Sequence, residues 1–571
     1  MAFGTTSAVQ AANVWAVDDK GNITLNGQIY RLRGGSWFGL EGRHEPSNDA
    51  TNPSGAPMEM YLGNMFWSES GRTLAQDAKD IKALGFNSIR LPLSPQTLSD
   101  SDPQGKDPNL KNAPAVRIQG AFTALKETIK ACNTAGLYVM LDLHSCSNFV
   151  GWRKGRLDAR PPYADANRVG YDYKREEYSC SETGNPSTVK YIHAYNTTKW
   201  LADLKKLAGL GAEIGVDNII GIDIFNEPWD YTWSEWRSLI DQAYAAISSV
   251  NPNILIFAQG VGSTHGSQDG SPETKEKTPH GDTASNPNWG ENLFDAGRQP
   301  PTMPKSKLVF SPHTYGPAVF QQAIFADPSQ PECIGLEGEA FAAKKCQLVI
   351  NQTQVDRGWN EHFGYLRALG YAVIPGEFGG NMDWPNKTDT HTKNLWAYLT
   401  DKAIDQKWQE AFVDYMMREG IYDSFYWSIN PESADTYGIF TSPYDPVSNN
   451  SGWGTWSNVD ERKMSLLNKL WNAPPVAEPG KAASIQGTAK HQFNLRVSSM
   501  GLISYSLPKA EFVSLKLYNM DGKLVSEVIG KQQAAGFYSV TRRQMQAEPG
   551  VYLAVFKAGG HSYHQTLTLT N

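Results

Sequence analysis

The segment NIIGIDIFNEP, residues 218–228, decides the fold that this sequence predicts. Its first half is rich in isoleucine, a β-branched residue type that favours a buried strand. It ends in the polar pair Asn226 and Glu227. Short apolar runs that alternate with helical patterns indicate βα units around a parallel sheet.

Eight such runs occur along the chain: YRLRGGSWF (30–38), FNSIRLPL (86–93), LYVMLDLH (137–144), NIIGIDIFNEP (218–228), NILIFAQG (253–260), KLVFSPHTY (307–315), YAVIPGEFGG (371–380) and YDSFYWSIN (422–430). Between them lie helical segments such as 73–85, which Gly85 is placed to end, and 234–250, which Ser234 is placed to cap. Eight right-handed βα units predict an α/β protein with a (β/α)₈ TIM barrel.

The chain has 571 residues, which is more than one hydrophobic core usually serves. After residue 473 the sequence becomes rich in Pro, Ala and Gly, and beyond residue 490 apolar and polar residues alternate between Asp-Gly and Gly-Gly turns. We therefore expect an N-terminal extension over 1–13, a barrel over 14–473, a linker over 474–490 and a small all-β sandwich over 491–571.

The net charge of −7 comes without any basic run, which argues against nucleic acid as a partner and favours a neutral one. No stretch approaches the roughly 20 apolar residues of a membrane span, and the first residues lack the apolar centre of a signal peptide. We assign about half of the 17 tryptophans to cores. The others lie in polar segments, where an exposed ring can stack on a sugar: Trp152, Trp229, Trp233, Trp289, Trp384 and Trp453.

The five cysteines show no close pair typical of zinc ligands. Cys146 with Cys180 and Cys333 with Cys346 lie in loop-like segments and would form disulfides in an oxidising compartment. Cys132 lies in an amphipathic helical stretch, where a buried free thiol is the expected state.

Polar residues gather where the predicted strands end, which is the active-site face of a barrel of this kind. They are Arg90, His144, Asn226, Glu227, His313, Tyr315, Glu377 and Trp427. Two carboxylates delivered from two strand ends are the minimum equipment of a glycosidase. The alternatives are that the glutamates are buried ion-pair partners, or that Asp142, His144 and His313 bind a metal. The spacing does not support a metal, and we expect neither a metal nor a cofactor.

The ordered motifs resemble glycoside hydrolase family five, the cellulase family. They are GGSWFG with Trp37, IRLP with Arg90, LDLH with His144, NEP at 226–228, HTY at 313–315, GEFG at 376–379 and YWS at 426–428. The resemblance covers roughly residues 14–473.

This resemblance implies a retaining mechanism with Glu227 as acid/base and Glu377 as nucleophile. The cation of Arg90 and the hydroxyl of Tyr315 would keep Glu377 ionised. Asn226 would bind the sugar 2-hydroxyl, and Trp427 would form the stacking floor. His144 and His313 would hydrogen-bond within the site, and Trp37, Glu41 and His44 would also contact the substrate.

We expect a retaining endo-β-1,4-glucanase whose partner is cellulose or another β-linked glucan. An endo-β-mannanase or xyloglucanase with the same mechanism is the alternative, and a barrel that binds polysaccharide without cleaving it is the non-enzymatic one. The C-terminal segment resembles immunoglobulin-like modules of bacterial secreted enzymes, including sorting tails. A carbohydrate-binding module and a spacer are its alternatives. We expect a monomer that is secreted, with attachment to a bacterial cell surface as one outcome.

Overall fold

The computed structural model describes residues 12–40, 73–93, 95–98, 121–144, 157, 195–228, 231–265, 276–281, 285–388, 390–431, 433, 436–443, 456–475, 494–497, 503–507, 510–533, 536–540, 545, 547–558 and 560–569. The chain divides into two compact units. The larger is made of Met1–Met417 and Ile421–Ala473, and the smaller of Arg418–Gly420 and Pro474–Asn571.

The larger unit is built on a closed sheet of parallel strands. Their order is β12-β14-β15-β4-β5-β6-β7-β8-β11-β13. The strands are β4 (Arg33–Ser36), β5 (Ser88–Leu93), β6 (Tyr138–Leu143), β7 (Ile219–Asp223), β8 (Leu255–Ala258), β11 (Leu308–Phe310), β12 (His313–Tyr315), β13 (Ala372–Val373), β14 (Glu377–Gly379) and β15 (Ser424–Tyr426). This order begins with β12 and ends with β13, and the ring closes because β12 directly follows β11 in the chain and β14 directly follows β13, while β11 pairs with β13 and β12 pairs with β14.

Each of the eight predicted runs contains a strand of this sheet, so the (β/α)₈ barrel is confirmed. Two runs are divided into two short strands each, β11 with β12 and β13 with β14. Pro312 follows the first of one pair and Pro375 the first of the other. Proline has no backbone N–H to donate to the ladder, which accounts for both interruptions.

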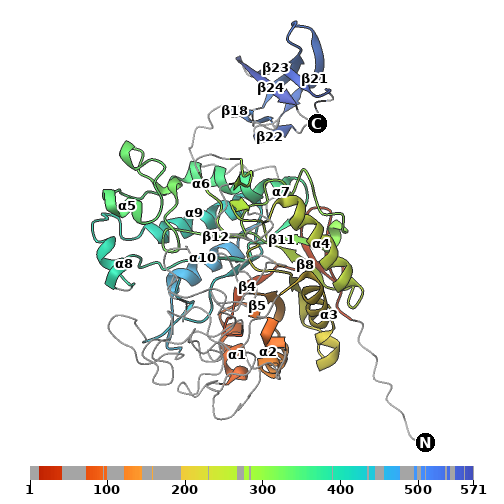
Figure 1. The fold of residues 1–571 in the computed structure, drawn as a ribbon, viewed down its shortest axis with the longest axis vertical. Coiled ribbons are helices and arrows are strands. Elements are labelled where there is room, and N and C mark those ends of the chain that lie inside the picture. Colours follow the sequence, from red (N-terminus) through yellow and green to blue (C-terminus); the bar gives the residue numbers. More distant parts are fainter. Residues whose placement is uncertain are drawn as a thin grey trace, which may run out of the picture. The chain divides into compact units, whose positions relative to one another are not determined.

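Helices lie around the barrel strands (Figure 1). They are α1 (Leu74–Ala83), α2 (Ala121–Ala135), α3 (Thr197–Ile214), α4 (Trp233–Ser248), α5 (Glu339–Lys344), α6 (Gln352–Trp359), α7 (Tyr365–Ala368), α8 (Thr390–Leu395), α9 (Ile404–Glu419) and α10 (Glu461–Trp471). As predicted, α1 ends just before Gly85, whose φ is 100°. The prediction of Ser234 as the cap of α4 is wrong. Thr232 caps this helix, because its side chain accepts from Glu235 N while Glu235 bonds back to the cap in a capping box.

A small antiparallel sheet covers the amino ends of the barrel strands. It consists of β1 (Trp15–Val17), β2 (Ile23–Leu25) and β3 (Gln28–Ile29). Trp15, Val17 and Ile23 pack into one buried cluster with residues of the barrel strands. The N–H of Trp15 donates to Asn253 O, just before β8. This end of the barrel is therefore closed, and the loops at the opposite end carry the polar residues.

Cys333 and Cys346 form the predicted disulfide, and Cys132 is the predicted buried free thiol. Cys146 and Cys180 lie outside the described residues. Among the helices that the structure describes, none has the length and apolar character needed to cross a membrane.

The smaller unit consists of two antiparallel sheets. One contains β18 (Asn494–Val497), β19 (Ile503–Leu507) and β22 (Gly536–Val540), and the other contains β20 (Glu511–Tyr518), β21 (Leu524–Gln533), β23 (Gly550–Ala558) and β24 (His561–Leu569). Tyr505, Leu507 and Val540 from the first sheet share one buried cluster with residues such as Leu515 and Phe556 from the second. This packing confirms the predicted all-β sandwich.

Candidate active site at the carboxyl ends of the barrel strands

Two glutamates face each other, one after the carboxyl end of β7 and one after the carboxyl end of β13. Glu377 is the first residue of β14 and is almost fully buried. Glu227 lies in the turn after β7 with a φ of 47°, a conformation that non-glycine residues rarely adopt. One carboxylate oxygen from each glutamate and one ring nitrogen of His313 all lie within 4.8 Å of one another. The structure therefore brings the two predicted carboxylates together.

The backbone around Glu227 is held by residues from neighbouring strands. Its N–H donates to Oε1 of Gln259, 2.8 Å away, just after β8. The nearest side-chain atom to a Cβ placed on Gly290 would be the same Gln259 oxygen, at 2.7 Å, followed by Glu227 Cγ at 3.4 Å. Only a glycine leaves room for this arrangement, and its φ of 77° also favours glycine.

Arg90 on β5 is the central cation of the site. Its guanidinium forms ion pairs with Asp142 at 2.9 Å, with Asp223 at 3.2 Å and with Glu377. Burial opposes the charge on Arg90, but the three carboxylates outweigh it and raise its pKa above the ordinary value. The guanidinium also donates to Oδ1 of Asn226 at 3.0 Å, so Arg90 links β5 to β6, β7 and β14.

Two of these carboxyls belong to buried aspartates at the ends of their strands. Burial raises the pKa of Asp142 to about 7, with Arg90 opposing the rise. Burial and the neighbouring Asp142 raise the pKa of Asp223 well above its ordinary value, with Arg90 and Gln259 opposing. Gln259 donates to Asp223 Oδ2 at 2.8 Å. Neither Asp223 nor Gln259 was predicted to belong to the site, although a charged residue within the isoleucine-rich run was the available signal for Asp223.

Tyr315 and His313 approach the glutamates from β12. The hydroxyl of Tyr315 donates to Glu377 Oε2 at 2.5 Å. Burial and Glu377 together raise the pKa of Tyr315 well above its ordinary value, so the phenol remains a neutral donor. Nδ1 of His313 lies 3.1 Å from Glu227 Oε1 and 3.5 Å from Glu377 Oε2. Burial lowers the pKa of His313 to about 3, so the imidazole is neutral and its Nδ1–H can donate between the two carboxylates.

His144 and Asn226 form the adjoining side of the site. Nδ1 of His144 is 2.7 Å from Asp142 Oδ2, and its Nε2 is 3.3 Å from the amide nitrogen of Asn226. Since an amide nitrogen only donates, Nε2 accepts and Nδ1–H donates to Asp142. The tautomer of His144 is thus set by its two neighbours.

The predicted aromatic residues lie in different environments. The ring of Trp427 lies nearly parallel to those of Phe38, 5.3 Å away, and His144, 6.1 Å away. Its indole N–H donates to Ser433 Oγ at 3.3 Å. Trp37 is fully buried and packs edge-on against Trp456, so its indole presents no face to solvent.

Among the six tryptophans expected to expose a ring, Trp233 and Trp384 are buried, and for these two the expectation is wrong. Trp289 is half-buried, and Trp152, Trp229 and Trp453 lie outside the described residues. Glu41 and His44, which were expected to contact substrate, lie outside them as well.

The group formed by Glu227, His313 and Glu377 also has the spacing of a metal site. Its ligand atoms are engaged by other groups, however. Glu377 is paired with Arg90 and Tyr315, and His313 Nδ1 is directed at Glu227. These contacts explain the close spacing without an ion.

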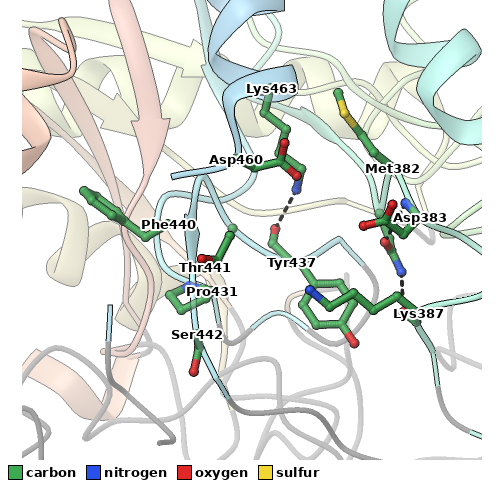
Figure 2. A pocket seen from close by; sticks show the side chains of 12 residues that line it. Met382, Asp383, Lys387, Pro431, Tyr437, Phe440, Thr441, Ser442, Asp460 and Lys463 are labelled. Carbon is green, nitrogen blue, oxygen red and sulfur yellow. Dashed lines mark hydrogen bonds between the residues drawn. The ribbon is translucent and has the colours of Figure 1, made fainter. Parts of the chain in front are cut away.

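A pocket lies between the loops that follow β14 and β15 (Figure 2). Arg462 joins two of its acidic residues, donating to both oxygens of Asp383 and to Asp460. The amine of Lys387 lies 4.9 Å from the centre of the Tyr437 ring. Neither candidate catalytic glutamate lines this pocket.

A parallel barrel of eight βα units with two close glutamates beyond its strand ends is the arrangement found in glycoside hydrolases. The sequence model of the family described as cellulase (glycosyl hydrolase family 5) matches residues 51–433. The chain belongs to glycosyl hydrolase family 5.

Two curated relatives of this chain are endoglucanases by name. The chain is 55% identical over 469 residues to "Endoglucanase C" of Cellvibrio japonicus, an alignment that covers 81% of this chain and 62% of that protein. It is 28% identical over 452 residues to the "Major extracellular endoglucanase" of Xanthomonas campestris pv. campestris, covering 76% of this chain and 72% of that protein. The chain thus spans less than two thirds of the length of the Cellvibrio relative.

The fold is similar to that of a solved structure, the catalytic domain of the major endoglucanase from the same Xanthomonas. The TM-score is 0.53 at 24% sequence identity, and the match covers 80% of this chain and 99% of that chain. At this identity the likeness supports the barrel fold alone.

Proposed function

We propose that the larger unit is a retaining endo-β-1,4-glucanase that hydrolyses internal bonds of cellulose or mixed-linkage glucan. The observation that carries the proposal is the closeness of the two carboxylates. One oxygen of Glu227 lies within 4.8 Å of one oxygen of Glu377. Retaining enzymes hold their carboxyl groups about 5–5.5 Å apart, whereas inverting enzymes hold them about 6.5–9.5 Å apart to admit a water. The short separation supports double displacement.

In this mechanism the carboxylate of Glu377 attacks the anomeric carbon, and the glycosidic bond breaks as Glu227 transfers its proton to the leaving oxygen. Glu227 then takes a proton from water, which attacks the same carbon and releases Glu377. The contacts of Glu377 with Arg90 and Tyr315 support its role, because a guanidinium and an O–H donor both favour a negative oxygen.

The acid/base role of Glu227 is supported by its surroundings. Its side chain is 18% exposed, against 5% for Glu377, so it is the more open of the two to water. The neutral His313 beside it can donate a hydrogen bond but supplies no positive charge. Such a setting suits a carboxyl group that alternates between the protonated and ionised forms.

Substrate binding is proposed for the remaining predicted residues. Asn226 would bind the 2-hydroxyl and Trp427 would stack under the sugar, with Arg90, His144, His313 and Tyr315 holding the reacting centre. Glu41 and His44 remain proposals for substrate contacts, whereas no stacking contact is proposed for Trp37, because its ring is fully buried. The names of the relatives favour a β-1,4-glucan over mannan or xyloglucan.

The test is reducing-sugar release from carboxymethylcellulose, mixed-linkage β-glucan, glucomannan, xyloglucan and xylan by the native chain and by the Glu377→Gln and Glu227→Gln variants. We expect release from the two glucans by the native chain alone, with proton NMR of the first product detecting the β-anomer. An α-anomer would exclude retention, and release from glucomannan alone would replace the glucanase with a mannanase. The absence of release from every polymer would favour a barrel that only binds polysaccharide.

For the smaller unit we propose an immunoglobulin-like module of the kind found in secreted bacterial enzymes, with a role in sorting. Its two antiparallel sheets are compatible with that class. We further propose that the protein is a secreted monomer, which fits the printed name of its extracellular Xanthomonas relative. Fractionation of producing cells, with and without residues 474–571, tests the sorting role.

A further inference from the structure

Asp405 is a buried carboxyl that the proposed mechanism does not use. It lies in the first turn of α9 and is fully buried. Its Oδ1 accepts the N–H of Ala318 at 2.9 Å, and its Oδ2 accepts the side-chain amide of Gln409, also at 2.9 Å. Both oxygens thus act as acceptors, which is the pattern of an ionised carboxylate.

The Asp405 carboxylate packs directly against the backbone that follows two residues of the site. Gly316 comes immediately after Tyr315, and a Cβ placed on it would lie 2.8 Å from Asp405 Oδ1. Gly380 comes immediately after β14, which begins with Glu377, and a Cβ there would overlap Oδ2. Glycine at these two positions allows the carboxylate to contact both segments.

Gln409 extends the contact to a third strand. Its Oε1 accepts the hydroxyl of Tyr426 at 2.7 Å, and Tyr426 directly precedes Trp427. The Tyr426 oxygen in turn has a backbone hydrogen bond with Gly380. A single buried hydrogen-bond network therefore joins α9 to the ends of β12, β14 and β15.

We propose that Asp405 is a positioning residue for the nucleophile side of the active site. Through Ala318, Gln409 and Tyr426 it fixes the segments that carry Tyr315, Glu377 and Trp427. The inference rests on the proposed glycosidase activity. Its reason is geometric, because Tyr315 and Glu377 meet across one hydrogen bond of 2.5 Å between two strands. A displacement of about 1 Å at a reacting group can reduce the rate about 100-fold.

Charged groups around Asp405 come from other elements. Lys463 on α10 is fully buried, interacts electrostatically with Asp405, and donates to Thr436 O at 2.8 Å and to Tyr437 O at 3.3 Å. Figure 2 shows this lysine at the wall of the pocket, close to Asp460. Burial raises the pKa of Asp405 to about 7, while the two hydrogen bonds and Lys463 oppose the rise.

The decisive variant is Asp405→Asn, which keeps the shape of the side chain and replaces one acceptor with a donor. The carbonyl oxygen of the introduced asparagine would still accept from Ala318, but its amide nitrogen would face the amide nitrogen of Gln409, donor to donor. We expect kcat to fall about 10- to 100-fold with KM changed less than about threefold, because the substrate contacts remain while the reacting groups move.

The double variant Asp405→Asn/Gln409→Glu should restore the pattern. The introduced asparagine amide would donate to the introduced glutamate, whose other oxygen would still accept the Tyr426 hydroxyl. We expect the kcat of the double variant to return to within about threefold of the native value. Gln409→Glu alone would place two carboxylates against each other, and its kcat should be lower than the native kcat.

The matched control is Asp423→Asn, which makes the same substitution at a carboxyl that accepts the N–H of Leu32 and, in the described part of the chain, contacts none of the candidate catalytic residues. Its kcat should equal the native one. A native kcat in Asp405→Asn overturns the inference, and so does a double variant that is as slow as the single one. An inactive native chain would instead remove the proposed function, so the two failures are distinguishable.

Discussion

The hydrogen bond from Tyr315 to Glu377 gives the sharpest test of how the proposed nucleophile, Glu377, is held. Tyr315→Phe removes the hydroxyl and leaves the ring in place. A hydrogen bond to a charged group contributes about 1.5–3 kcal/mol. At about 1.36 kcal/mol for each tenfold change in rate, we expect kcat to fall about 10- to 150-fold if the bond acts in the transition state. Initial rates on mixed-linkage β-glucan and urea unfolding together measure the effect.

Tyr365→Phe is the matched control. Its hydroxyl, on a half-buried residue, shares its proton between the carbonyls of Leu293 and Phe294 and accepts the N–H of Gly297, and among the described residues it contacts none of the candidate catalytic ones. It should lower the free energy of unfolding and leave kcat unchanged. A Tyr315→Phe variant with native kcat, or one whose loss matches that of Tyr365→Phe, would refute the assigned contribution of this bond.

Three further outcomes are expected. Arg90→Met leaves the carboxylates of Asp142, Asp223 and Glu377 buried without their cation and should lower the free energy of unfolding by about 3–5 kcal/mol at pH 7 in urea titrations; native stability would show that the cluster does not need its charge. Reduction of the Cys333–Cys346 disulfide, whose cysteines are 13 residues apart, should lower the free energy of unfolding by about 3 kcal/mol and leave kcat unchanged. An unchanged midpoint of urea unfolding would contradict this. Burial raises the pKa of Asp423 to about 6, so the folded state binds a proton more tightly than the unfolded state and the free energy of unfolding falls as pH rises from about 4 to 6. In Asp423→Asn this fall should be smaller, by at most about 3 kcal/mol across the same pH range. An identical fall in the variant and the native chain would argue against the assignment.

The barrel was predictable because its strands are local features of the sequence. Runs rich in β-branched residues, such as 218–228, can each be recognised from their own sequence. The carboxyl ends of parallel strands then meet on one face of the barrel. Arg90, Glu227 and Glu377 could therefore be grouped before their distances were known. The disulfide followed similarly from two cysteines in one loop-like segment.

Other features depend on contacts between distant residues. Nothing near Asp405 in the sequence indicates that Ala318 bonds to it or that Tyr426 reaches it through Gln409, and Gln259 follows an ordinary apolar strand. Trp233 and Trp384 stand in polar segments, but tertiary packing buries both rings. The cap of α4 was missed although Thr232 and Glu235 carry the capping-box spacing.

Two prolines divide barrel strands and separate the apolar wall of the barrel from the rim that carries the candidate catalytic residues. The carbonyls of Pro312 and Pro375 accept hydrogen bonds from the N–H groups of Gly376 and Phe425, respectively. Neither proline has an N–H to donate, so each lacks the hydrogen bond to the strand on its other side. Above this break His313 pairs directly with Glu377, while below it Phe310 pairs with Val373. The upper strands therefore pair separately from the apolar strands below them, which offers designers a place to graft a new set of polar residues onto the same barrel.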